Sequence, residues 1–321
     1  MMIIRLILIL SRELRRGKRA VLVPLLLAIV GVSCGEAAGG EEDRRQGLLV
    51  VATTSIHGDI VSRVVGHAGT VEVLMPIGAD PHDFQPSARQ VALIGAADLV
   101  VVNGLELEEG LLDVLDSLQG ARVLELAPLL DPLPLRQDEL HDDDYGDLDP
   151  HVWLDPVRIA DGVQRVGRRL AELDGGEQFV QRAASYREQL LSTHQEVRAT
   201  LEQVPPGRRK LVTNHETLAY FADRYRFEVV GTVIPGGATV AEPSARQLAR
   251  LAELVEAEDV PAIFVETTAG AALAEAVAQE VGHQVEVVTL FTESLGEPGS
   301  GADSYLGLLR TNAERIAGAL G

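Results

Sequence analysis

The chain has 321 residues, of which 46% are hydrophobic and 24% are charged, with one cysteine and a net charge of −20. This length and apolar content predict one large or two ordinary globular domains and exclude a chain that is disordered throughout. A single cysteine excludes a disulfide framework within the chain. The strong negative charge makes nucleic acid and anionic lipid poor partners, because both would be repelled.

The first 33 residues differ from the rest of the chain. Five basic residues and one acidic residue lie between Arg12 and Arg19, and an apolar run of 13 residues follows from Ala20 to Val32. This run is too short to span a bilayer comfortably, but a basic segment ahead of an apolar core is typical of a secretion signal. We therefore predict a signal segment at 1–33. Its removal changes the net charge from −20 to −25, because six basic residues and one acidic residue are lost.

The apolar run ends at Val32-Ser33-Cys34-Gly35, which contains the only cysteine. A small residue followed by cysteine at the end of a signal core resembles a bacterial lipobox, in which the cysteine becomes the lipidated first residue. We predict lipidation of Cys34 and a flexible tether over 34–47, since Glu36 to Gln46 is rich in glycine, alanine and charge. The alternative is a buried thiol inside the signal.

Two sets of strands and helices alternate along the remaining sequence. The first set has predicted strands at 48–53, 71–74, 98–102 and 122–126, and predicted helices at 56–65, 87–96 and 107–118. The second set has predicted strands at 210–213, 228–232, 261–265 and 285–290, and predicted helices at 215–225, 244–258, 271–281 and 305–320. Apolar runs that alternate with helices predict parallel sheets covered by helices on both faces.

Two helical segments separate these sets. The first is predicted at 157–173 and ends at Gly175-Gly176. In the second, from Glu177 to Val204, apolar positions recur at helical spacing, and His194 falls in the same stripe, so we expect this histidine to be a packing residue. The predicted fold class is α/β, with two lobes of mainly parallel strands joined by a long rigid helix. The predicted boundaries are 48–156 for the N-terminal lobe, 157–206 for the linking helices and 207–321 for the C-terminal lobe.

Three histidines follow predicted strands or begin predicted helices. They are His82 in Gly78-Ala79-Asp80-Pro81-His82-Asp83-Phe84, His151 in the proline-bracketed turn Asp149–Pro156, and His215 after the strand 210–213. Glu293 follows the last strand of the second set. Since ligands bind beyond the carboxyl ends of the strands in parallel α/β units, we expect these four side chains to meet in the cleft between the lobes. Three imidazoles and one carboxylate suit a divalent transition metal, and zinc is a natural occupant.

Several enzyme signatures are missing, which favours binding over turnover. His215-Glu216 has no second histidine four residues later, as a helical zinc-protease motif requires, and the sequence has no dinucleotide fingerprint and no Walker-type phosphate loop. Ser55 and Ser244 lack the setting of a nucleophile elbow. The acidic loop 138–147 does not match a calcium-binding loop, and we expect its single His141 to be solvated.

Several motifs occur in the order in which one known family has them. They are Val51-Ala52-Thr53-Thr54-Ser55-Ile56, Gly78 to Phe84, Ala97-Asp98-Leu99-Val100, Asn103-Gly104, Asp149 to Pro156, His215 with Tyr220-Phe221, Glu242-Pro243-Ser244, Phe264-Val265-Glu266, and Ser304-Tyr305-Leu306 with Asn312. Through these motifs the chain, over residues 48–320, resembles the zinc- and manganese-binding solute-binding lipoproteins of bacterial ABC importers. The resemblance implies that His82, His151 and His215 are metal ligands, with the fourth ligand position at Glu293.

The resemblance also implies a partner and a place in the cell. A protein of this kind captures Zn²⁺ or Mn²⁺ outside the cytoplasm, in the periplasm or anchored by lipid to the bacterial cell membrane, and hands the ion to an ABC permease driven by its ATPase. We expect a monomer that is not an enzyme and that has no nucleic-acid partner. The fourth ligand of the family is commonly aspartate, whereas Glu293 is one methylene longer. His57 stands where the family is often apolar, and we expect it to be a wall or surface residue.

Two other function classes stay open from the sequence. One is a zinc-dependent hydrolase of the same fold, in which three histidines hold zinc and water takes an open fourth position. The other is a surface adhesin, which would need an extended exposed interaction patch. A coordination sphere of four protein ligands would favour the metal receptor. The choice of metal is also open, since three imidazoles favour zinc while two or more carboxylates would favour manganese.

Overall fold

A computed structural model describes residues 47–118, 122–135, 148–234, 243–268 and 270–321. The predicted signal segment 1–33, the predicted lipidation site Cys34 and the acidic loop 138–147 with His141 lie outside the described residues. None of the helices in the described ranges combines the length and the apolar character that a membrane crossing needs.

The described residues form two four-stranded parallel sheets with the same strand order. The first sheet has the order β2-β1-β3-β4, from β1 (Leu48–Ala52), β2 (Gly69–Val73), β3 (Leu99–Val102) and β4 (Val123–Glu125). The second has the order β6-β5-β7-β8, from β5 (Lys210–Thr213), β6 (Glu228–Thr232), β7 (Ala262–Glu266) and β8 (Glu286–Leu290). The prediction of a two-lobed α/β fold with parallel sheets is therefore confirmed. We call the first sheet with its helices the N-terminal lobe and the second with its helices the C-terminal lobe.

The central strands are apolar because both faces of each sheet are covered. All four residues of β3 and all five residues of β7 are buried. Branched side chains such as Val100, Val101 and Ile263 fit a pleated surface that is packed on both sides. The N-terminal lobe carries α2 (Ser55–Val65), α3 (Ala88–Ala96) and α4 (Leu112–Asp116), and the C-terminal lobe carries α7 (Ala219–Tyr225), α8 (Ala245–Ala257), α9 (Ala272–Glu280) and α10 (Tyr305–Leu320).

The same five residues begin a helix in each lobe. Pro86-Ser87-Ala88-Arg89-Gln90 opens α3, and Pro243-Ser244-Ala245-Arg246-Gln247 opens α8. In both copies the serine is the N-cap and forms a reciprocal capping box with the glutamine three residues later. Together with the shared strand order, this repeat makes the two lobes structural copies of one β/α unit.

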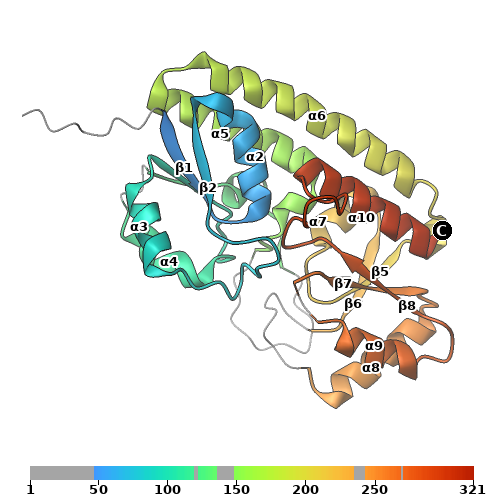
Figure 1. Ribbon diagram of the computed structural model, residues 1–321. Coiled ribbons are helices and arrows are strands. Elements are labelled where there is room, and N and C mark those ends of the chain that lie inside the picture. Colours follow the sequence, from blue (N-terminus) through green and yellow to red (C-terminus); the bar gives the residue numbers. More distant parts are fainter. Residues whose placement is uncertain (1–46, 119–121, 136–147, 235–242, 269) are drawn as a thin grey trace, which may run out of the picture. The chain divides into compact units, whose positions relative to one another are not determined.

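Two long helices connect the lobes. Asp155 caps α5 (Pro156–Asp174), and Gly175 ends it in the left-handed conformation with a φ of 72°. The chain then returns through α6 (Glu177–Leu201), which packs against α5, against α2 of the N-terminal lobe and against α10 of the C-terminal lobe (Figure 1). His194 of α6 is half-buried with its Nδ1 atom 3.2 Å from Tyr225 Oη, as expected for a packing residue.

Two predicted helices are shorter in the structure. The helix predicted at 107–118 is a 3-10 turn at Glu109–Leu111 followed by the five residues of α4, and the two residues before it, Leu105 and Glu106, have positive φ angles. The helix predicted at 215–225 begins only at Ala219. The preceding residues form a tight turn, in which the Thr213 hydroxyl donates to the carbonyl oxygen of His215 at 2.5 Å.

Candidate metal centre

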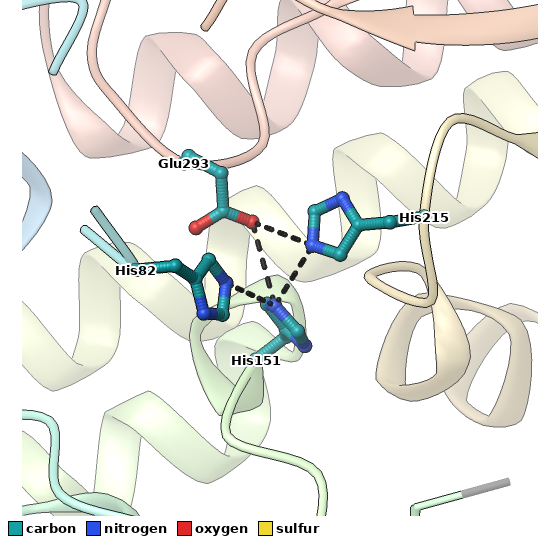
Figure 2. Close-up of side chains that lie close together, drawn as sticks. All are labelled: His82, His151, His215 and Glu293. Carbon is teal, nitrogen blue, oxygen red and sulfur yellow. Dashed lines mark hydrogen bonds and ion pairs between the residues drawn. The ribbon is translucent and has the colours of Figure 1, made fainter. Parts of the chain in front are cut away.

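The structure brings His82, His151, His215 and Glu293 together in one buried group (Figure 2). One possible ligand atom from each residue lies within 4.8 Å of those of the others. His151 Nε2 is 3.4 Å from His82 Nε2, 3.2 Å from His215 Nε2 and 3.5 Å from Glu293 Oε1. Zinc bonds of ~2.0–2.1 Å in a tetrahedron would hold ligand atoms about 3.3 Å apart. The three separations from His151 Nε2 are close to this spacing, and the other ligand atoms lie within 4.8 Å of one another.

The four side chains come from both lobes and from segments that follow strands. His82 lies between β2 and α3, and His151 immediately precedes a 3-10 turn at Val152–Leu154 that leads into α5. His215 follows β5 and Glu293 follows β8. These positions agree with the rule that parallel α/β sheets present ligand sites beyond the carboxyl ends of their strands. The group thus lies between the lobes and depends on both of them.

Two of the histidines are held by buried carboxylates on their second ring nitrogen. His151 Nδ1 is 2.7 Å from Asp149 Oδ1, and the same oxygen accepts the backbone N–H of His151 at 2.9 Å. His215 Nδ1 is 2.5 Å from Glu266 Oε1. His82 is held differently, because Asp80 Oδ1 accepts its backbone N–H at 2.9 Å. The site therefore contains two histidines whose Nε2 atoms are aimed by a carboxylate partner.

Burial and mutual proximity set the charge of the group. Burial lowers the pKa of both His82 and His151 well below the usual value, and the neighbouring imidazoles lower it further. Burial alone would lower the pKa of His215, but the carboxylates of Glu266 and Glu293 outweigh it and raise that pKa to about 9. Burial raises the pKa of Glu293 well above its usual range. A proton on His215 thus balances buried negative charge, and a divalent cation would supply the same compensation with more charge.

Hydroxyl groups fix the segment that carries Glu293. Thr217 Oγ1 donates to Glu293 Oε1 at 3.1 Å. The next residue, Ser294, places its Oγ atom 3.1 Å from Ser55 Oγ and accepts the backbone N–H of Gly78 at 2.8 Å. Ser55 Oγ in turn accepts the backbone N–H of Leu295 at 3.0 Å. These bonds tie the end of β8 to the N-terminal lobe directly beside the proposed carboxylate ligand.

Trp153 forms the wall of the site behind His151. Its ring centroid is 5.3 Å from that of His151 in an edge-on arrangement, and its indole N–H donates to the carbonyl oxygen of Thr292 at 2.5 Å. His57 also packs edge-on against Trp153, with ring centroids 6.2 Å apart, and is not part of the ligand group. It is a buried wall residue whose Nδ1 atom is 2.8 Å from Thr54 Oγ1.

Sequence reasoning missed the residues that support the ligands. Asp149 and Glu266 were not singled out as partners of the histidines, although both lie in motifs that carry the family resemblance. Glu266 ends the otherwise apolar strand β7, and an acidic residue at the end of a buried strand is the one signal that pointed to it. Thr217 has no comparable signal, because its role depends on the position of Glu293 some 76 residues away in sequence.

The four side chains of this group limit the chemistry that a bound metal ion could perform. Three imidazoles and a carboxylate would complete a tetrahedral sphere and leave no ligand position for an attacking water. Catalytic zinc sites instead keep one position open. The arrangement of these four residues is therefore suited to holding an ion rather than to activating water.

Known proteins share this fold and sequence. Residues 50–319 match the family model described as zinc-uptake complex component A, periplasmic. The chain is 33% identical over 282 residues to the zinc-binding protein TroA of Treponema pallidum, covering 85% of this chain and 88% of that one. It is 29% identical over 300 residues to the manganese-binding lipoprotein MntA of Halalkalibacterium halodurans, covering 93% and 97%. The solved structure of periplasmic TroA from Treponema pallidum covers 86% of this chain and 99% of its own, with a TM-score of 0.78 and 32% identity.

Proposed function

Because the chain belongs to the zinc-uptake complex component A family, we propose that it captures a divalent transition metal outside the cytoplasm and delivers it to an ABC importer. The observation that carries this proposal is the convergence of His82, His151, His215 and Glu293 within 4.8 Å. The family consists of solute-binding proteins of metal transporters and not of enzymes. A hydrolase is therefore the weaker reading of the same three histidines.

We assign the metal ligands to the Nε2 atoms of the three histidines and to the carboxylate of Glu293. The assignment is supported by separations of 3.2 to 3.5 Å from His151 Nε2 to the other three side chains and of 3.7 Å between His215 Nε2 and Glu293 Oε1. Zinc is the preferred ion in the proposal, because three imidazoles and a single carboxylate suit zinc better than manganese. Manganese is the second candidate, since relatives are named for each of the two metals.

The finer features of the proposal concern the anchor and the partners. The signal segment 1–33 would direct export, and lipidated Cys34 with the tether 34–47 would hold the protein at the outer side of the cell membrane. The names of relatives as lipoproteins support this anchor. A monomer with the lobes 48–156 and 207–321, linked by 157–206, would present its metal to the permease, while the ATPase drives import.

Metal analysis of the exported protein tests the proposal directly. Protein purified without added metal should contain about one zinc ion per chain, and the chelator-treated protein should take up one zinc ion with high affinity. The variant His151→Ala should lose this tight site, while the variant of the exposed His67, His67→Ala, should keep it. Protein that takes up neither zinc nor manganese would overturn the proposed function.

A further inference from the structure

His215 lies between two buried carboxylates. Its Nε2 atom faces the proposed metal position and is 3.7 Å from Glu293 Oε1, while its Nδ1 atom is 2.5 Å from Glu266 Oε1. Figure 2 shows one ring nitrogen of His215 directed at the other three side chains and the second directed away from them. Glu266 is not one of the four residues that surround the proposed ion. Glu266 contacts His215, which is a proposed metal ligand, but Glu266 is not itself a proposed ligand.

We propose that Glu266 is a positioning residue, which holds His215 in the tautomer that binds the ion and thereby slows release of the metal. This inference rests on the proposed function. A neutral imidazole carries one N–H group and one lone pair, and a carboxylate can only accept a hydrogen bond. Glu266 next to Nδ1 therefore places the proton on Nδ1 and leaves the lone pair of Nε2 for the metal.

The surroundings of Glu266 argue that this is its role. The side chain is buried, and within the described ranges neither carboxylate oxygen forms a hydrogen bond of good geometry. Its polar contact is the ion pair with His215 Nδ1 at 2.5 Å. Burying a carboxylate with so little support is costly for folding. A residue that served only to stabilise the lobe would be better replaced by an apolar side chain at this position. Within the described residues, the ion pair with His215 is the interaction that offsets the cost of burying this carboxylate.

The N-terminal lobe contains the same arrangement, in which Asp149 holds His151 at 2.7 Å. Each lobe thus contributes one histidine with a carboxylate behind it. His82 is the exception, because within the described residues its only ring-nitrogen contact is His151 Nε2. Each lobe would therefore bind the ion through one imidazole that a carboxylate orients. Loss of either carboxylate should weaken metal binding.

Two substitutions separate positioning from bulk effects. Glu266→Leu removes the acceptor, and Glu266→Gln keeps an amide oxygen that can still accept the Nδ1–H bond while removing the charge. The matched control is Glu125→Leu. Glu125 also ends a strand, but it is exposed and is not one of the four proposed ligands. Circular dichroism and thermal unfolding of each metal-free variant establish that it folds.

The decisive measurement is the rate at which the zinc-loaded protein gives up its ion to an excess of a colorimetric chelator. Glu266→Leu should release zinc about 10–100-fold faster than the parent, the usual effect of losing such a partner. Glu266→Gln should retain most of the parent's slow release, and Glu125→Leu all of it. The visible absorption of bound Co²⁺ should weaken or shift in Glu266→Leu only, because the imidazole is no longer aimed.

Equal release rates in the parent, Glu266→Leu and Glu266→Gln would overturn the inference while leaving the proposed function intact. A parent protein that binds no zinc would instead overturn the proposed function. Equal acceleration in both Glu266 variants, with an unchanged Co²⁺ spectrum, would show that the charge of Glu266 acts without orienting the ring, and it would also overturn the positioning role.

Discussion

Ser294 Oγ of the C-terminal lobe lies 3.1 Å from Ser55 Oγ of the N-terminal lobe, one residue beyond the proposed ligand Glu293. The same Ser294 hydroxyl accepts the backbone N–H of Gly78, in the loop that leads to His82. A small polar contact between lobes is thus placed where two proposed ligands from opposite lobes approach each other. The closure of the lobes and the geometry of the site are therefore linked through these hydroxyls.

Removing this contact should speed metal release without removing a ligand. A typical hydrogen bond contributes about 0.5–1.5 kcal/mol, so Ser294→Ala should raise the zinc dissociation rate by roughly 2- to 12-fold. Chelator-transfer kinetics measure the effect. The control is Ser192→Ala on the exposed side of α6, whose hydroxyl donates to Glu196 Oε1 at 3.4 Å. If Ser294→Ala released zinc at the same rate as the parent, this contact between the lobes would not control metal release.

Glu293 should be the residue that distinguishes a closed sphere from an open one. Glu293→Gln keeps the shape but removes the charge, and we expect binding to weaken by at least the ~10–100-fold seen for partners of metal ligands. Glu293→Asp keeps the charge and should bind more tightly than Glu293→Gln. Calorimetric titration with zinc measures both, and Glu314→Gln on the exposed face of α10 is the control.

If Glu293→Gln bound zinc as tightly as the parent, the carboxylate would not be a ligand. The three histidines would then hold an ion with an open position, and the hydrolase alternative would regain support. Neither Glu293 variant should gain or lose hydrolytic activity on the receptor reading, since none is expected in the parent.

The pH dependence of folding should report His57. Burial lowers the pKa of this imidazole to about 4, from an ordinary value of 6.5. Between pH 6.5 and 4 the imidazole of His57 binds a proton in the unfolded chain but not in the folded one. The free energy of unfolding therefore falls as the pH falls from about 6.5 to 4. The full loss is on the order of 3 kcal/mol.

Urea unfolding of the metal-free protein at pH 7 and pH 4.5, in the presence of a chelator, measures this loss. His57→Leu should remove the share that comes from His57, so its stability should change less between the two pH values than that of the parent, while the share from the buried His82 and His151 remains. The exposed His67→Leu should behave like the parent. An acid response of His57→Leu equal to that of the parent would assign the effect to other groups.

The proposed anchor at Cys34 predicts a change of location without a change of affinity. Cys34→Ala should release the exported protein from the membrane fraction, because no lipid can be attached. Its zinc affinity should equal that of the parent, since the ligands lie in the folded lobes. Fractionation followed by immunoblotting measures the first effect, and wild-type protein found wholly outside the membrane fraction would contradict the lipoprotein assignment.

Strands were the part of the fold that the sequence predicted best. The predicted bounds of β5, β6 and α10 agree with the structure at both ends, and β3 differs by one residue. Strands buried on both faces leave an unbroken apolar run, which turn residues then delimit. The start of α7 could not be predicted, because the contacts of His215 with distant residues override local helical spacing.

The candidate site was predictable only in outline. Each of the four proposed ligands follows a strand or precedes a helix, which is visible in the sequence. The carboxylate partners of the histidines could not be predicted from the sequence, because the approach of Glu266 to His215 depends on how β5 and β7 pair. The repeated Pro-Ser-Ala-Arg-Gln, which begins at residues 86 and 243, is visible in the sequence and is a sign of lobe duplication.

Helix α6 belongs to both lobes, because it packs against α2 of the N-terminal lobe and against α10 of the C-terminal lobe. One continuous apolar core accordingly includes Val50 and Leu99 of the first sheet as well as Leu211 and Phe264 of the second. Because the two lobes share this core, an ion bound by residues of both lobes would protect both of them from unfolding. At a free metal concentration of 1,000 times Kd this protection is about 4 kcal/mol. On the proposed function, the metal-loaded protein should therefore resist proteolysis longer than the metal-free protein.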